Sequence, residues 1–169
     1  MQKFIIHICD ENFDFKFLEN FECFLLAQNL DSHFIFEFIN LAHKKNKLVL
    51  TTSVVDCLAY SADGVLLDLS KSENIKKDYF KQTQNLKNKF IGVICRNRRH
   101  EAMLVSECEP DFVVFRAWAD GIQKVKELTD WYSEMFLIQS ALLLVEDVPY
   151  QTFKTDFIII KPNHIKNAG

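Results

Sequence analysis

Short apolar runs that end in small polar residues recur along the whole chain. Residues 48–68 show the pattern most fully, with an apolar run at 48–50, a short helical segment, and a second apolar run at 64–67. Strands of a parallel sheet are buried on both faces, so their sequences are continuous apolar runs and do not alternate between apolar and polar residues. This stretch therefore predicts a strand, a short helix and a second strand parallel to the first.

The same unit repeats from one end of the chain to the other. The expected strands cover residues 4–8, 23–26, 48–50, 64–67, 90–94, 112–115, 135–138 and 157–160. The segments between them show helical spacing, as in Phe34, Phe38 and Leu41 behind an Asp31-Ser32 cap. Eight strands separated by helices predict an α/β fold, a small (β/α)8 TIM-type barrel. Because such barrels typically run to ~250 residues, the helices must be shortened. We expect no final helix, and only a turn or a single helical turn between the first two strands.

The composition fits a single domain that covers residues 1–169. Hydrophobic residues make up 49% of the chain, which is enough for a sizeable core, and the net charge of -3 gives no case for binding nucleic acid or an anionic membrane. No segment approaches the ~20 apolar residues of a membrane span, so we expect a cytoplasmic protein. The five cysteines include no CxxC pair, which indicates reduced core thiols and no metal site.

Polar residues follow most of the expected strands. In barrels of this type the chemistry lies at the carboxyl ends of the strands, with phosphate usually held after strands seven and eight. Arg96, Arg116 and Lys161 follow strands five, six and eight, and they could meet at one mouth and bind a phosphate or carboxylate. The alternative is that each pairs with a carboxylate and forms a rim. The other expected ligand-binding residues are Thr51, Asp68, Gln139 and Ser140.

Two residues at the expected mouth are candidate catalytic groups. Asp10 follows the first strand and could form a carboxylate pair with Asp68 for acid–base work or metal binding; a surface salt bridge is the simpler interpretation. Cys95 lies beside Arg96, which could lower the pKa of its thiol, although an inert thiol fits as well because no histidine partner is evident. His7 is expected to be a packed or solvent-facing imidazole.

Three stretches between residues 45 and 118 carry a family pattern. They are Ala62-Asp63-Gly64-Val65; Ile91-Gly92-Val93 followed by Glu101-Ala102; and Glu109-Pro110-Asp111-Phe112-Val113. Together they resemble the thiamine-phosphate synthase and thiazole tautomerase family. The resemblance implies the same barrel and, by descent, a magnesium-dependent reaction that joins a pyrimidine pyrophosphate to a thiazole phosphate.

The chain departs from this family at the residues that carry its chemistry. An aspartate that helps to hold magnesium in the family falls within Thr51-Thr52-Ser53 here, and a second one falls near Lys71. A hydroxyl is a poor replacement for a carboxylate in a magnesium site. Phosphate loops need glycine for close backbone approach, but the chain has four glycines, and Ser140-Ala141 stands where the family has Gly-Gly.

Two kinds of function stay open. The first is a non-catalytic barrel without a cofactor, which binds a small phosphorylated or carboxylate ligand, a protein partner or a second copy of itself. The second is an enzyme, either a thiamine-phosphate synthase that uses magnesium or a metal-free thiazole-phosphate isomerase with Asp10 or Cys95 as the proton-transfer group. The missing carboxylates and glycines favour the first.

Overall fold

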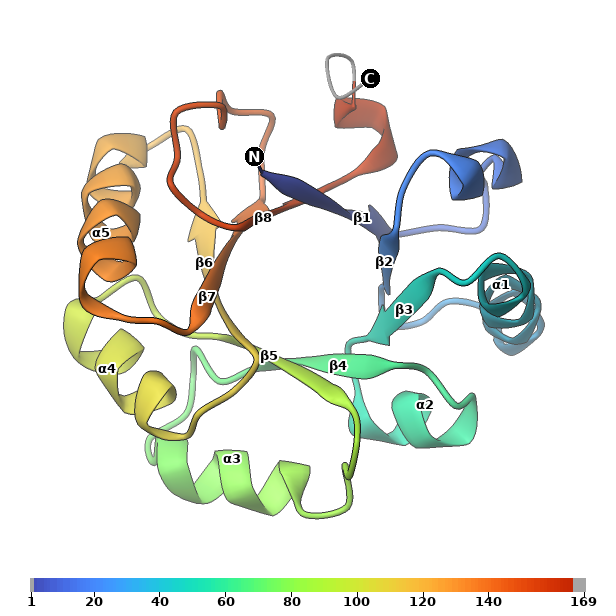
Figure 1. Cartoon of the computed structure of the whole chain (residues 1–169), viewed down its shortest axis with the longest axis horizontal. Coiled ribbons are helices and arrows are strands. Elements are labelled where there is room, and N and C mark those ends of the chain that lie inside the picture. Colours follow the sequence, from blue (N-terminus) through green and yellow to red (C-terminus); the bar gives the residue numbers. More distant parts are fainter. Residues whose placement is uncertain (1, 166–169) are drawn as a thin grey trace.

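Eight parallel strands close into a barrel in the computed structural model, which describes residues 2–165 (Figure 1). The strands are β1 Lys3–Ile8, β2 Cys23–Leu26, β3 Leu48–Thr51, β4 Gly64–Asp68, β5 Phe90–Ile94, β6 Phe112–Ala117, β7 Gln139–Leu144 and β8 Phe157–Ile160. Each strand pairs with its neighbours in sequence, and β1 closes the barrel on β8. The predicted (β/α)8 barrel is therefore confirmed.

Short helices form an outer ring around the strands (Figure 1). They are α1 Ser32–Lys44, α2 Val54–Ala59, α3 Ile75–Thr83, α4 Arg99–Glu107 and α5 Ile122–Met135. Asp31 caps α1 as predicted, because its carboxylate accepts the backbone N–H groups of His33 and Phe34. The 3₁₀ turn η1, Phe15–Glu19, takes the place of a helix between β1 and β2, also as predicted. A second 3₁₀ turn, η2 at Pro162–His164, follows β8. We expected no final helix after β8, and residues 166–169, on which this expectation also bears, lie outside the described residues.

The seventh strand lies later in the chain than predicted. Residues 135–138 were expected as the strand, but Met135 ends α5, and β7 begins at Gln139. The ring of Phe136 stacks on Tyr132 of α5, with centroids 4.8 Å apart, and Leu137 is fully exposed. The apolar run at 136–138 therefore belongs to the connection that follows α5 and is not part of the sheet. The connection from β7 to β8, residues 145–156, contains no helix.

Alternation along the strands separates the inside of the barrel from the layer that faces the helices. The residues that meet inside the barrel are Ile5, Leu25, Leu50, Leu66, Ile94, Phe112, Val114, Ala141 and Ile159. Their neighbours in sequence pack outward, as Phe24 does against Phe38 of α1, with ring centroids 5.4 Å apart. Side chains two positions beyond the inner residues consequently reach the mouth at the carboxyl ends of the strands.

Three aspartates tie the strands together at the opposite, N-terminal face. Asp63, Asp111 and Asp156 directly precede β4, β6 and β8. Each carboxylate accepts a backbone N–H from the start of the preceding odd-numbered strand: Val49 at 2.8 Å, Ile91 at 2.7 Å and Ser140 at 3.0 Å. The backbone N–H of each aspartate donates back to the carbonyl of the same residue. These charge-assisted clamps fix the register between three pairs of strands.

Candidate functional site

The mouth of the barrel contains a pocket of about 300 Å³ at the carboxyl ends of the strands. Its floor is apolar and is formed by Leu25, Leu66 and Ile94 from the barrel interior. Its polar lining comes from five different strands or the loops that follow them: His7, Gln28, Thr52, Asp68 and Arg116. The mouth is therefore open, with an apolar base and a polar wall.

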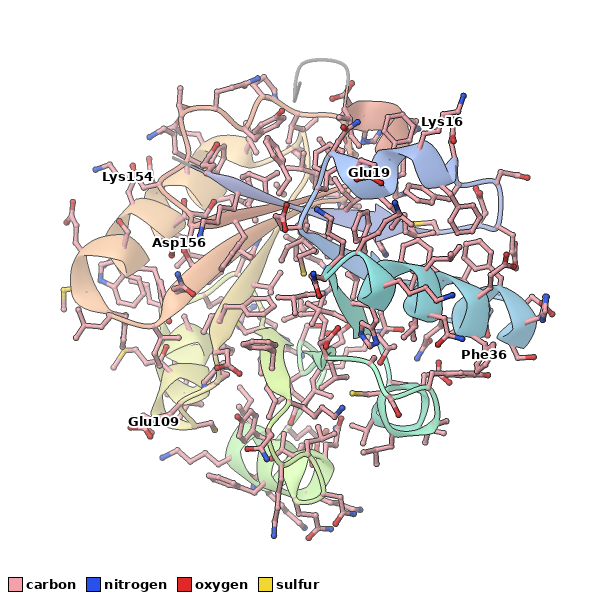
Figure 2. The ribbon with its side chains drawn as sticks, turned by 45° about the vertical axis from the view of Figure 1, so that its right-hand side comes forward. Lys16, Glu19, Phe36, Glu109, Lys154 and Asp156 are labelled. Atoms are coloured by element: carbon pink, nitrogen blue, oxygen red, sulfur yellow. The ribbon has the colours of Figure 1, made fainter. Side chains whose placement is uncertain are left out.

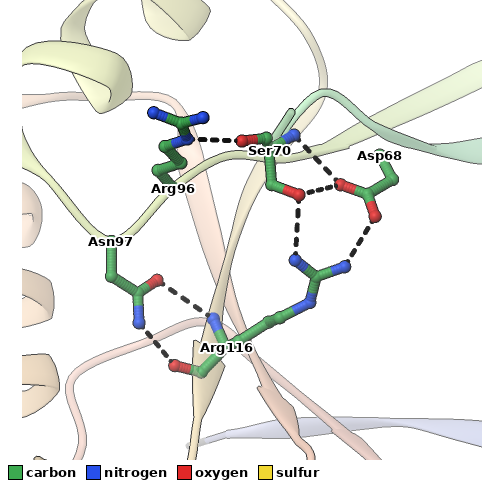
Figure 3. A network of polar contacts seen from close by, with 5 residues as sticks. All are labelled: Asp68, Ser70, Arg96, Asn97 and Arg116. Carbon is green, nitrogen blue, oxygen red and sulfur yellow. Dashed lines mark hydrogen bonds and ion pairs between the residues drawn. The ribbon is translucent and has the colours of Figure 1, made fainter. Parts of the chain in front are cut away.

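Arg116 of β6 is fixed in this wall by the end of β4 and the loop after it (Figure 3). Its Nη2 donates to Oδ2 of Asp68 at 2.6 Å, and its Nη1 donates to Oγ of Ser70 at 3.0 Å. Ser70 donates in turn to Oδ1 of Asp68 through its hydroxyl, at 2.6 Å, and through its backbone N–H, at 3.0 Å. The Asn97 amide donates to the carbonyl of Arg116 and accepts its N–H. The guanidinium consequently has one preferred position.

The Asp68 carboxylate is charged at neutral pH. Burial by itself raises the pKa of this group, but the hydrogen bonds from Ser70 and Arg116 and the charge of Arg116 together bring the pKa below its usual value. Both carboxylate oxygens are engaged in the network. Because Asp68 and Arg116 form an ion pair, they add no net charge to the mouth.

Two buried polar atoms at the mouth have no hydrogen-bond partner within residues 2–165: Nδ1 of His7 and Oγ1 of Thr52. Burial lowers the pKa of His7 to about 4, and the charge of Lys161 acts in the same direction, so the imidazole is neutral. A buried polar group without a partner costs roughly 1–3 kcal/mol. A bound molecule that supplied the missing hydrogen bonds would remove this cost.

His7 and Thr52 were not predicted as ligand-binding residues. The signal was present in the alternation of the strands, because His7 lies two positions after Ile5, and Thr52 two positions after Leu50, on the inward side. A polar residue at such a position faces the mouth. Thr51, which was predicted to bind a ligand, is buried on the outward side, and its hydroxyl donates to the carbonyl of Ser53 at 2.8 Å.

The three cations expected to converge do not share a cavity. Arg116 lines the mouth pocket, whereas Nε of Arg96 donates to the carbonyl of Ser70 at 2.7 Å (Figure 3). Lys161 lines a neighbouring cavity of about 480 Å³ beside the ends of β1 and β8. The prediction of a three-cation site is therefore wrong, because the loop after β4 holds both arginines. Whether each cation binds a ligand stays a prediction.

Gln139 and Ser140 lie at the wrong end of the barrel for the predicted role. They open β7, so they lie at the N-terminal face, where the N–H of Ser140 is bound by Asp156. The residues that follow β7 at the mouth end are Val145, Glu146 and Asp147. The comparison of Ser140-Ala141 with the family's phosphate glycines is wrong for the same reason.

The two candidate catalytic residues occupy different surroundings. Cys95 is buried in the layer between the sheet and the helices, and this burial, with a smaller effect of Glu101, raises the pKa of its thiol to about 12. A thiol in that state is not a nucleophile at neutral pH, so the inert interpretation fits. Asp10 is exposed, accepts the N–H of Asn12 at 2.9 Å, and lines the cavity of Lys161 instead of the mouth pocket. Asp10 and Asp68, the possible carboxylate pair, therefore do not share a pocket, and the simpler interpretation of Asp10 as a surface residue fits.

The polar groups at the mouth do not fit magnesium. Protein sites for this ion are built from one or two carboxylates with free oxygens. Asp68 is the carboxylate that lines the mouth pocket, and its oxygens are already engaged by Ser70 and Arg116. Across the described part of the chain, no three His, Cys, Asp or Glu side chains are grouped so that they could share a metal ion.

No protein-family model matches this chain, and no curated protein matches it. None of the helices described in residues 2–165 has the length and apolar character that crossing a bilayer requires. The fold and the site define the protein as a small (β/α)8 barrel with a polar-walled pocket at its C-terminal mouth.

Proposed function

We propose that this protein binds a small polar molecule in the mouth of its barrel, without magnesium-dependent chemistry. The observation that carries the proposal is the presence of two buried, unpartnered polar atoms, His7 Nδ1 and Thr52 Oγ1, in the lining of one pocket. Buried polar groups are nearly always hydrogen-bonded in folded proteins, so two exceptions in one pocket favour a ligand that completes them.

The pocket sets limits on the molecule. A volume of about 300 Å³ lies at the small end of ligand sites, and the apolar floor suits the face of a single ring or a short carbon chain. The wall offers the remaining N–H groups of the Arg116 guanidinium as donors and the Gln28 amide as both donor and acceptor. The ion pair leaves the wall without net charge, which favours a neutral ligand with several hydrogen-bonding groups in this pocket.

We propose descent from the thiamine-phosphate synthase family as the origin of the fold, and not as a guide to the reaction. Asp63 and Asp111 belong to the stretches that resemble the family, and both are clamps at the N-terminal face. At the mouth, Thr52 offers a hydroxyl where the family has a magnesium carboxylate. The resemblance therefore supports a shared scaffold more than a shared activity.

Binding of a protein partner through the outer faces has less support. Phe36 of α1 points away from the barrel (Figure 2), and Phe80 of α3 is also exposed. These two helices are separated along the outer ring by α2 (Figure 1), where the smaller side chains of Val55 and Leu58 are exposed. Many of the other phenylalanines pack against one another inside the outer layer, as Phe13, Phe24 and Phe38 do.

The test is a nuclear magnetic resonance screen of the full chain with small polar heterocycles, including the unphosphorylated thiazole and pyrimidine alcohols of the resembled family. We expect bound compounds to shift the amides of Ala27, Thr52 and Leu66, equally with and without magnesium. Thr52→Val should weaken binding about tenfold through the loss of one hydrogen bond, whereas Thr152→Val, on the exposed β7–β8 connection, should not.

Two outcomes would overturn the proposal. One is a screen in which the shifts do not gather at the mouth, or in which Thr52→Val changes nothing. The other is magnesium-dependent turnover of the pyrimidine pyrophosphate and thiazole phosphate by the purified protein.

A further inference from the structure

We propose that the cavity between the ends of β1 and β8 is a second site, which binds the carboxylate or phosphate group of a small organic anion at Lys161. This cavity measures about 480 Å³ and is distinct from the mouth pocket, although His7 lines both. It lies on the mouth side of the barrel and is walled by the segment from β1 to η1 and by the residues that follow β8. The proposal does not depend on the mouth pocket having a ligand.

The ammonium group of Lys161 has no carboxylate partner within residues 2–165. Two carboxylates also line the cavity, but each is exposed and bound to its own loop. Asp10 accepts the N–H of Asn12 at 2.9 Å, and Asp14 accepts the N–H of Lys16 at 3.0 Å, where it caps η1. Asp10 and Asp14 keep their negative charges, but neither forms an ion pair with Lys161, so the ammonium group is available to an incoming anion.

The charge of Lys161 acts on two of its neighbours in the cavity, His7 and Cys9. After burial, Lys161 is the group that lowers the pKa of His7. Burial raises the pKa of the Cys9 thiol, and of the two charges that act on this thiol, Lys161, which lowers the pKa, outweighs Asp10, which raises it. Lys161 therefore acts on both of these neighbours, and Asp10 and Asp14 are exposed residues of the same lining.

The other lining residues define what kind of anion fits. Lys161 offers three N–H donors to an anion, and the neutral imidazole of His7 lies in the same lining. Phe13 and Phe17 line the same cavity and present apolar surface. A molecule with a carboxylate or phosphate at one end and an apolar part at the other matches this arrangement.

Anion binding at this site should be coupled to the protonation of His7. The charged groups that face His7 are Lys161 after β8, Asp10 and Asp14 beyond β1, and the paired Asp68 and Arg116 across the mouth. Burial is the larger cause of the low pKa of His7 and the charge of Lys161 the smaller one. An anion on Lys161 offsets the smaller cause, so this pKa rises and the bound state takes up a proton below neutral pH. The affinity for an anion that stays ionised should consequently increase as the pH falls toward the pKa of His7.

The experiment follows the ring proton resonance of His7 in the full chain during pH titrations at constant ionic strength, in chloride, inorganic phosphate or trifluoroacetate, a carboxylate that stays ionised across the titration. We expect phosphate, trifluoroacetate or both to raise the pKa of His7 relative to chloride. A response to phosphate alone assigns a phosphoryl ligand, and a response to trifluoroacetate assigns a carboxylate. Lys161→Met should raise the pKa in chloride and abolish the response, whereas Lys161→Arg should retain it.

Lys154→Met is the matched control, because Lys154 is an exposed lysine at the N-terminal face, and Figure 2 places it well away from Lys16 of η1, the turn that borders the cavity. This variant should respond to anions like the unaltered chain. Thr52→Val should also respond fully, which separates this site from the mouth pocket. Two results would overturn the proposal. One is a His7 pKa that is the same in chloride and in both test anions, and the other is an anion-induced rise of this pKa that is still present in Lys161→Met.

Discussion

The two ends of the barrel are built on opposite principles. At the N-terminal face, Asp63, Asp111 and Asp156 repeat the same clamp, in which backbone and side chain both bind the start of the preceding strand. At the mouth no arrangement repeats, and two buried atoms without partners, His7 Nδ1 and Thr52 Oγ1, line one pocket, whereas the N-terminal face has such an atom in Thr155 Oγ1. In barrels of this type, such a division separates the end that supplies stability from the end that supplies function.

The strongest test of this division lies at Gly64, the first residue of β4. A Cβ at this position would lie 2.4 Å from the carbonyl oxygen of Phe90 and 2.8 Å from Cδ2 of Leu50. Because a backbone atom cannot move away cheaply, Gly64→Ala should lower the free energy of unfolding by about 3 kcal/mol, at the upper end of the usual cost of overpacking. Urea denaturation measures this quantity.

Gly121→Ala is the control for Gly64→Ala. Its φ is 75° and an added Cβ would meet nothing within 4 Å, so it should cost only about 1 kcal/mol, from the left-handed backbone. An equal cost for the two variants would show that close packing at the N-terminal end does not matter.

At the mouth, the largest effect on stability should come from pH. The pKa of His7 is about 4 in the folded protein and near 6.5 when the chain is unfolded. The unfolded chain therefore binds the proton more tightly, and folding loses stability as the pH falls from about 6.5 to about 4, by at most about 3 kcal/mol. Denaturation of the unaltered chain and of His7→Gln at about pH 7 and about pH 4 measures this loss. In His7→Gln, the loss of stability between these two pH values should be smaller by the contribution of His7. An equal loss in the variant and the unaltered chain would contradict a neutral, buried His7.

Removing one clamp should have an intermediate effect. Asp63→Ala deletes the acceptor of the Val49 N–H and the partner of His43, whose Nε2 lies 2.9 Å from the carboxylate. We expect a loss of about 2 kcal/mol in the free energy of unfolding, with unchanged ligand binding at the mouth. Asp10→Ala removes an exposed carboxylate at the other end and should cost less than about 1 kcal/mol. If Asp10→Ala lowered the free energy of unfolding more than Asp63→Ala did, the described difference between the two ends of the barrel would be wrong.

The smallest effect on stability should accompany the largest effect on binding at the mouth. Thr52→Val removes a buried hydroxyl that has no partner, so the free energy of unfolding should change by less than about 1 kcal/mol, and the expected sign is stabilising. A clear loss of stability by thermal denaturation would mean that the hydroxyl already has a structural partner.

The strands could be predicted because a parallel sheet leaves a direct mark on the sequence. Val65, Leu66 and Leu67 are all buried, as both faces of β4 are covered, so a continuous apolar run is sufficient to find the strand. The same rule failed at β7, because an equally apolar run at 136–138 packs against α5 or faces solvent. Run length alone does not distinguish the end of a helix from the start of a strand.

The site was less predictable, because its residues meet only through long-range pairing. Alternation could have placed His7 and Thr52 at the mouth. It could not show that Arg116 would turn to Asp68 and Ser70, since that contact depends on the loop after β4 and on the position of Asn97. The resemblance was also carried partly by aspartates whose role is structural, which is why it indicated the fold better than the site.

The pairing of β1 with β8 has a consequence for the order of folding. Most strand pairs join neighbours in sequence, whereas Lys3 to Ile6 pair with Phe157 to Ile160 across almost the whole described chain. Contacts of such high sequence separation carry the largest loop-closure entropy and form slowly. We therefore expect an open, curved sheet of consecutive strands to form first and the seam between β1 and β8 to close last. Because His7 and Lys161 flank this seam, the cavity they share exists only once the ring is complete.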